Sequence, residues 1–127
     1  MRKFLLLFLF LIILVAAGCQ KINKELAFVG EGDIWSGQLI VDQNEGDEAY
    51  YIHLAYKGDN LDEVEPFLYN LTSQSGVVDY TDQNAELNEK GIFENSLLGE
   101  NSPSTNEEDE FEIEIRWNGK SEIFNLK

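Results

Sequence analysis

Cysteine occurs only once in the 127-residue chain, at Cys19, and this scarcity excludes several kinds of chemistry. A single cysteine cannot form an internal disulfide, and residues 20–127 contain no thiol for catalysis or metal binding. Histidine is equally scarce, with His53 alone. We therefore expect the fold to depend on an apolar core rather than on covalent or metal cross-links.

Positive charge is also sparse. Nine lysine and arginine residues face 24 aspartate and glutamate residues, which gives a formal net charge of −15. Phosphate binding needs clusters of basic side chains, so we expect no nucleic-acid partner. An anionic lipid surface would repel the chain. The acidity is typical of a soluble, self-repelling surface, and loose binding of divalent cations or of a basic partner is the alternative.

The N-terminal apolar run is short for a bilayer span, so a permanent transmembrane helix is the weaker interpretation. The unbroken apolar run is residues 4–15, and as a helix it would reach about 18 Å, against roughly 30 Å of hydrocarbon. Arg2 and Lys3 precede this run and the small residues 16–18 follow it. This order of charged, apolar and small residues predicts a secretory signal peptide over residues 1–18.

Residues 16–19 (Ala-Ala-Gly-Cys) resemble a bacterial lipobox, with alanine at the position where leucine is commonest. In that family the cysteine receives a diacylglyceryl group and the signal peptide is cleaved before it. Two acyl chains anchor a protein stably, whereas one holds it marginally. The resemblance implies lipidation at Cys19 and a protein outside the cytoplasm, anchored to the bacterial cell membrane. An ordinary secreted protein with an incidental cysteine is the alternative.

Three segments follow from this interpretation: the signal peptide (residues 1–18), a tether (residues 19–29) and a folded domain (residues 30–127). Cleavage would leave 109 residues, enough for one domain with a modest core. Because Arg2 and Lys3 leave with the signal peptide, seven basic and 24 acidic residues would remain, a net charge of −17.

The mature part reads as six or seven short strands without a long amphipathic helix. The strongest strand is residues 49–56, in which Tyr50, Ile52, Leu54 and Tyr56 share the face predicted to point into the core. Other predicted strands are residues 34–41, with Trp35 and Leu39 inward, then 67–72, 77–81, 111–117 and 120–127. Asn118-Gly119 predicts a two-residue hairpin turn. Residues 82–90 are ambiguous, and residues 94–109 are predicted to form a long mobile loop.

Short strands separated by turns predict an all-β fold, an antiparallel β-sandwich of immunoglobulin-like type. The Cys–Trp–Cys pattern of true immunoglobulin domains is absent, so the prediction concerns architecture only.

The sequence offers few candidates for catalytic or metal-binding residues. His53 with a nearby carboxylate could act as a general base, but no nucleophile motif accompanies it, and we interpret it as a solvated side chain. An EF-hand loop starting at Asp82 fails, because Leu87 and Phe93 occupy its glycine and glutamate positions. Residues 42–48 fail likewise, although a weak cation site built from several loops stays open. We predict no catalytic residue, no metal ligand and no cofactor.

Aromatic residues leave two interpretations. Trp35, Trp117 and the five tyrosines could form a platform for carbohydrate or peptide, or they could pack in the core, which we favour. An open edge strand could also accept a partner strand. Residues 70–72 match a glycosylation sequon by chance.

The chain resembles small uncharacterised lipoproteins of Gram-positive bacteria. The resemblance rests on the lipobox and on residues 32–35, 54–58 and 112–122. It implies the fold and the location, and no functional residues. We expect a non-enzymatic lipoprotein that binds an unknown envelope protein or ligand. A low-affinity cation- or carbohydrate-binding module is the first alternative, and an enzyme using a carboxylate pair is the second.

Overall fold

The structure, a computed structural model, describes residues 24–44, 47–76, 78–97 and 105–127. The predicted signal peptide and Cys19 lie outside the described residues. The described chain forms eight β-strands and one short 3-10 helix: β1 (Lys24–Glu31), β2 (Trp35–Asn44), β3 (Asp47–Tyr56), η1 (Leu61–Glu63), β4 (Phe67–Ser73), β5 (Asp79–Ala85), β6 (Ile92–Leu97), β7 (Phe111–Trp117) and β8 (Lys120–Leu126).

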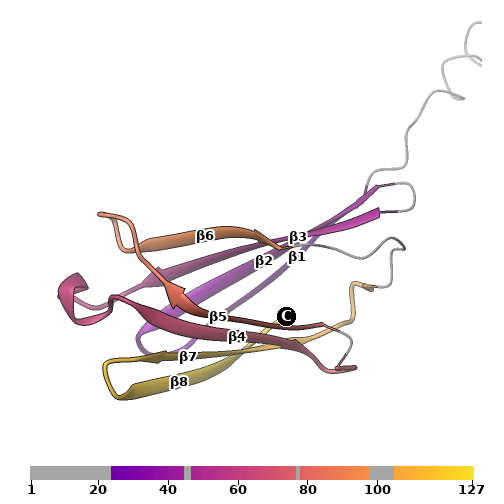
Figure 1. The fold of residues 1–127 in the computed structure, drawn as a ribbon. Helices are drawn as coiled ribbons and strands as arrows, with labels where there is room; N and C mark the ends of the chain where they lie inside the picture. Colours follow the sequence, from indigo (N-terminus) through magenta and orange to yellow (C-terminus); the bar gives the residue numbers. More distant parts are fainter. Residues whose placement is uncertain (1–23, 45–46, 77, 98–104) are drawn as a thin grey trace, which may run out of the picture.

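The strands form two antiparallel sheets that pack face to face (Figure 1). Sheet A has the order β1-β2-β3-β6, and sheet B has the order β5-β4-β7-β8. The predicted β-sandwich is thus confirmed. The immunoglobulin-like assignment is not confirmed: in that fold the third strand belongs to the second sheet, whereas β1, β2 and β3 form a consecutive meander within sheet A.

The core lies between the sheets and follows the alternation of the strands. In β2 and β7 every second residue is buried, as a period of two requires. Trp35 is fully buried, and its ring lies 5.0 Å from that of Phe67 and 5.6 Å from that of Trp117. The predicted inward positions of Trp35 and Leu39 in β2 and of Tyr50, Ile52 and Leu54 in β3 are confirmed, and the two tryptophans belong to the core rather than to a surface platform.

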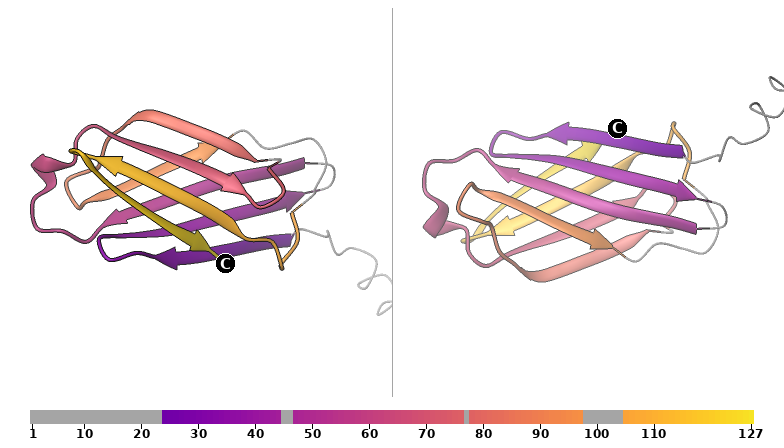
Figure 2. Two further views of the ribbon diagram at one scale, coloured as in Figure 1. Left: turned by 90° about the horizontal axis from the view of Figure 1, so that it is seen from below. Right: turned by 90° about the horizontal axis from the view of Figure 1, so that it is seen from above.

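One side of the sandwich is closed by the first and last strands. Val29 and Lys127 exchange backbone hydrogen bonds of 3.0 Å in both directions. Gly30 permits this approach, because a Cβ atom there would lie 1.9 Å from the carbonyl oxygen of Asn125. On the opposite side β5 and β6 run along the edges of the two sheets (Figure 2).

The two ends of the sandwich differ in what they carry. The end where β1 begins and β8 finishes, here called the proximal end, also carries the last residues of β2, the first residues of β3 and the approach to β7. The distal end carries η1 and the β7–β8 turn. In that turn Asn118 (φ 45°) and Gly119 (φ 73°) both have positive φ, which confirms the predicted Asn-Gly hairpin.

Three boundaries correct the sequence predictions. β1 starts at Lys24, inside the predicted tether, so the folded domain includes at least residues 24–29 of that segment. Its inward face offers only Leu26 and Phe28, too few for a clear pattern. β6 occupies residues 92–97 and therefore overlaps the start of the predicted loop. The sequence did not indicate a strand there, because polar Asn95 interrupts the apolar residues on its inward face. The rest of that predicted loop, residues 98–104, lies outside the described residues.

β5 is also longer than predicted. It extends to Ala85 through the polar run Asp82-Gln83-Asn84, which has low intrinsic β-propensity. Backbone pairing with β4 holds this segment in the strand conformation, and the register shifts between Phe67 and Tyr69 of β4. Tertiary pairing therefore settles the segment that local pattern left ambiguous.

Candidate binding face on sheet A

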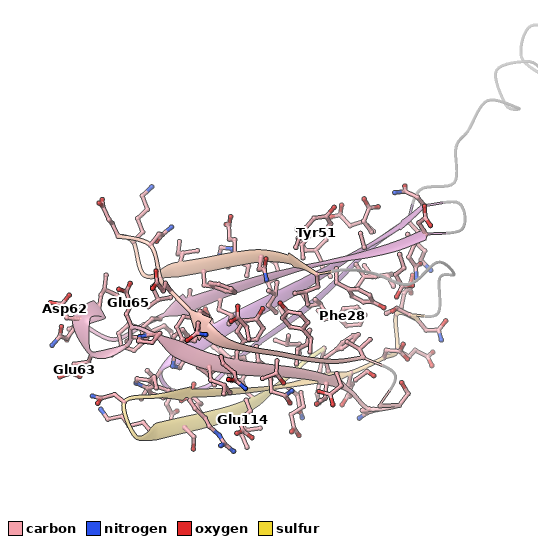
Figure 3. The ribbon with its side chains drawn as sticks, viewed as in Figure 1. Phe28, Tyr51, Asp62, Glu63, Glu65 and Glu114 are labelled. Carbon is pink, nitrogen blue, oxygen red and sulfur yellow. The ribbon has the colours of Figure 1, made fainter. Side chains whose placement is uncertain are left out.

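The outer face of sheet A points away from the core and is built from alternate residues of four strands. Its described residues are Glu25, Ala27, Val29 and Glu31 of β1; Ser36, Gln38, Ile40, Asp42 and Asn44 of β2; Asp47, Ala49, Tyr51, His53 and Ala55 of β3; and Ile92, Glu94 and Ser96 of β6. Figure 3 shows Tyr51 on this side, Phe28 between the sheets and Glu114 beyond sheet B.

Two large apolar side chains stand exposed on this face. Val29 is 56 % exposed and Tyr51 is 44 % exposed. The register places Ile40 directly beside Tyr51 on the neighbouring strand, and Ala27 beside Ile40. An apolar row therefore crosses from β1 to β3. Such side chains on a water-facing sheet are informative because a protein–partner contact often centres on an exposed tyrosine.

A polar row runs alongside the apolar one. Val29, Gln38, His53 and Glu94 are successive neighbours across the four strands. The Nδ1 atom of His53 lies 3.1 Å from Oε1 of Glu94, although both side chains remain open to solvent. This pair offers hydrogen-bonding groups at the border of the apolar row.

The two rows border a shallow hollow of about 430 Å³ between β2, β3 and β6. Its lining combines apolar and polar groups: Gln38, Ile40, Tyr51, Ile52, His53, Glu94, Asn95 and Ser96. A mainly apolar concavity with a few polar groups is the usual form of a binding site. A second hollow, of about 480 Å³, lies over Leu68, Gln83 and Arg116 on sheet B, but its lining is mostly polar.

Charge on the outer face of sheet A is mainly negative. Among its described residues Glu25, Glu31, Asp42, Asp47 and Glu94 are acidic, and none is lysine or arginine. Sheet B differs, because Arg116 there pairs with Glu114. One basic side chain reaches the sheet A face, because Nζ of Lys57, just after β3, lies 3.1 Å from Oε2 of Glu31. The other four carboxylates of that face have no lysine or arginine partner among the described ion pairs.

The His53–Glu94 pair could act in catalysis only by activating a nucleophile, either a hydroxyl group or a water molecule. Ser96 lies opposite Tyr51 in the register, and no hydrogen bond joins it to His53 among the described contacts. The interpretation of His53 as an outward-facing, solvated residue is consistent with its position.

A second polar cluster lies at the proximal end and was not predicted. Glu48 is only 2 % exposed and faces inward with Tyr50. Its Oε2 atom accepts hydrogen bonds from Nε2 of Gln43 (3.0 Å) and from the backbone N–H of Thr105 (3.2 Å). Its Oε1 atom accepts from the hydroxyl groups of Tyr50 and Thr105.

These bonds hold Glu48 ionised. Burial alone raises the pKa of the Glu48 carboxyl, but the hydrogen bonds from Thr105, Tyr50 and Gln43 outweigh burial and lower the pKa from 4.5 to about 2. Extending the alternation of β3 by two residues, from Tyr50 back to Glu48, would have placed this carboxylate on the core face. Its partner Thr105 lies 57 residues away and left no local signal. The cluster fastens the approach to β7 onto sheet A.

Other sequence candidates are not brought together. Among the described residues, no group of three or more histidine, cysteine, aspartate or glutamate side chains is arranged to hold a metal ion. The side-chain amide of Asn70, in the sequon, donates to Asp79 (2.9 Å) and Thr81 (2.7 Å) within sheet B.

The comparisons add no relative. Neither family models, nor curated proteins, nor solved structures give a match to this chain. Within the described residues no helix has the length and apolarity needed to cross a bilayer.

Proposed function

We propose that this chain is a lipid-anchored, non-enzymatic binding module of the bacterial cell envelope, which engages a partner through the outer face of sheet A. The observation that supports it most is the exposed Tyr51 with half-buried Ile40 beside it, at the hollow that His53 and Glu94 border. Tyrosine supplies a large, rigid contact surface with a polar end, which is why it is enriched at interfaces.

The anchor in this proposal is the lipid on Cys19. Because β1 begins at Lys24, only residues 20–23 separate the predicted lipid from the first strand. Fully extended, that length spans about 17 Å. The proximal end would then lie near the membrane, and the outer face of sheet A would stand beside it, open to other envelope components.

Mass spectrometry of the membrane-extracted protein tests the anchor. We expect a lipid-modified Cys19 at the new N-terminus, and we expect Cys19→Ala to lose both the modification and membrane retention. An unlipidated protein that begins at Met1, or membrane retention unchanged in Cys19→Ala, would contradict it.

Site-specific photo-crosslinking in cells tests the binding face. Val29 on sheet A and Ile123 on sheet B are each 56 % exposed, so they form a matched pair of positions for a photoreactive residue. We expect defined crosslinked products from position 29 and none from position 123. Equal products from both positions, or none from position 29, would refute sheet A as the contact face.

A carbohydrate ligand is the second candidate, and one observation favours it. The exposed Tyr51 ring lies beside the hydrogen-bonding side chains of Gln38, His53 and Glu94, a combination that can stack on a sugar ring and bind its hydroxyl groups. Titration with soluble cell-wall oligosaccharides, with Tyr51→Ser as the comparison, tests it. Heat of binding that is identical in both proteins would refute this site.

A further inference from the structure

We propose that the occupant of the outer face of sheet A is a cationic polypeptide segment, one of whose lysine or arginine side chains lies along Tyr51 with its charge at Glu94. This inference rests on the proposed function and names the partner's chemistry.

Net charge limits the occupants. The chain carries −15, so a second copy would add like charge, and nucleic acid or an anionic lipid surface would be repelled. The face itself holds five carboxylates, Glu25, Glu31, Asp42, Asp47 and Glu94, and Lys57 beside it pairs with one of them, Glu31. A basic partner is the one whose charge this surface complements.

The geometry fits a long basic side chain. In the register Tyr51 pairs with Ser96 and His53 pairs with Glu94, so Tyr51 and Glu94 are diagonal neighbours on adjacent strands. Diagonal positions lie about 7–8 Å apart. The apolar stem of lysine or arginine covers that distance across an aromatic ring and brings its charge to the carboxylate.

The apolar row indicates that the partner also contains apolar residues. Ile40 lies beside Tyr51, and Ala27 lies beside Ile40. The exposed Val29 lies on β1 two residues from Ala27, next to this apolar row. A segment seated over them would bury apolar side chains as well as neutralise charge. We therefore expect basic and apolar residues together in the partner, and weaker binding by a purely basic peptide.

Peptide titration of the full chain in zwitterionic phosphatidylcholine nanodiscs tests the inference. The probe is a ten-residue peptide of alternating lysine and valine, and the comparison peptides replace lysine with glutamate or contain lysine alone. We expect the lysine–valine peptide to bind with a Kd at least about tenfold lower than either comparison peptide. Binding by the glutamate–valine peptide of equal strength would overturn the charge argument.

Variants localise the binding. Tyr51→Ser should raise the Kd about tenfold, whereas Tyr51→Phe keeps the ring and should bind within about twofold of the original protein. Glu94→Gln should raise the Kd about threefold and reduce its salt dependence. Ile123→Ser and Glu114→Gln on sheet B are the matched controls and should leave the Kd unchanged. An unchanged Kd in both Tyr51→Ser and Glu94→Gln would place the peptide elsewhere and refute the proposal.

The two proposals fail in different ways. If position 29 forms crosslinks in cells but the crosslinked segment is neutral, acidic or a carbohydrate, the cationic occupant is refuted and the binding face stands. If position 29 forms no specific crosslink, the binding face itself is refuted. Equal melting temperatures of the variants and the original protein confirm that any loss of binding is local.

Discussion

Replacing the buried carboxylate of Glu48 should destabilise the sandwich in a pH-dependent way. The folded pKa of about 2 lies below the unfolded value of 4.5, so ionised Glu48 contributes about 3 kcal/mol to the free energy of unfolding above pH 4.5. Because the folded pKa is the lower one, this contribution is lost as the pH falls from about 4.5 toward 2.

The Glu48→Gln variant isolates the charge. Its amide oxygen can take the Oε2 position and accept from Gln43 and from the backbone N–H of Thr105. Its amide NH₂ group would face the hydroxyl groups of Tyr50 and Thr105, which can turn to accept. Most hydrogen bonds survive and the charge is lost, so we expect a destabilisation of about 1–3 kcal/mol at pH 7.

Urea denaturation at pH 7, 5, 4 and 3 measures the effect. The difference in free energy of unfolding between the original protein and Glu48→Gln should shrink steadily below pH 5. Glu86→Gln, at an exposed glutamate, is the control and should stay within about 0.5 kcal/mol of the original protein at each pH. A difference that is constant between pH 7 and pH 3, or one below about 0.5 kcal/mol at pH 7, would show that Glu48 is not held ionised by this cluster.

Three further predictions concern the packing and turns of the sandwich. Gly30→Ala should lower the free energy of unfolding by more than about 2 kcal/mol in thermal or urea denaturation, because its Cβ would overlap the carbonyl oxygen of Asn125; an unaltered stability would contradict the β1–β8 closure. Glu122→Ala should cost about 1–3 kcal/mol, because the Glu122 carboxylate accepts the backbone N–H groups of Ile34 (3.1 Å) and Trp35 (2.9 Å); a cost near zero would show that water replaces it. Gly119→Ala should cost about 1 kcal/mol, because Gly119 has a positive φ; a stabilised Gly119→Ala would refute the turn geometry. Gly32→Ala is the comparison that tests packing instead of backbone conformation, because the three atoms nearest to its Cβ would belong to the Glu122 side chain.

Sequence alone predicted the parts of the fold that follow a strict period of two. In β3 the alternation of Tyr50, Ile52 and Leu54 fixed both the strand and its inward face, and Asn118-Gly119 fixed the last hairpin. These signals are local, because side-chain alternation and positive φ depend on neighbouring residues only.

The parts that sequence missed depend on contacts between distant residues. β5 and β6 carry runs such as Glu94-Asn95-Ser96, whose strand conformation comes from backbone pairing with β4 and β3. The outward position of His53 was predictable, because it follows the alternation of β3. Its hydrogen bond with Glu94 was not predictable, because Glu94 lies 41 residues away on another strand. Sheet order, which decides such pairs, leaves little trace in local pattern.

The position of β1 has a mechanical consequence. β1 pairs with β2 through eight residue pairs in register, and it is the first strand after the predicted lipid. If a partner held the distal end while the lipid held Cys19, the pull would run along β1 and stress those backbone hydrogen bonds in shear, together rather than one after another. Bonds stressed in parallel share the force, so under the proposed lipid anchor β1 would resist being pulled out of the sandwich.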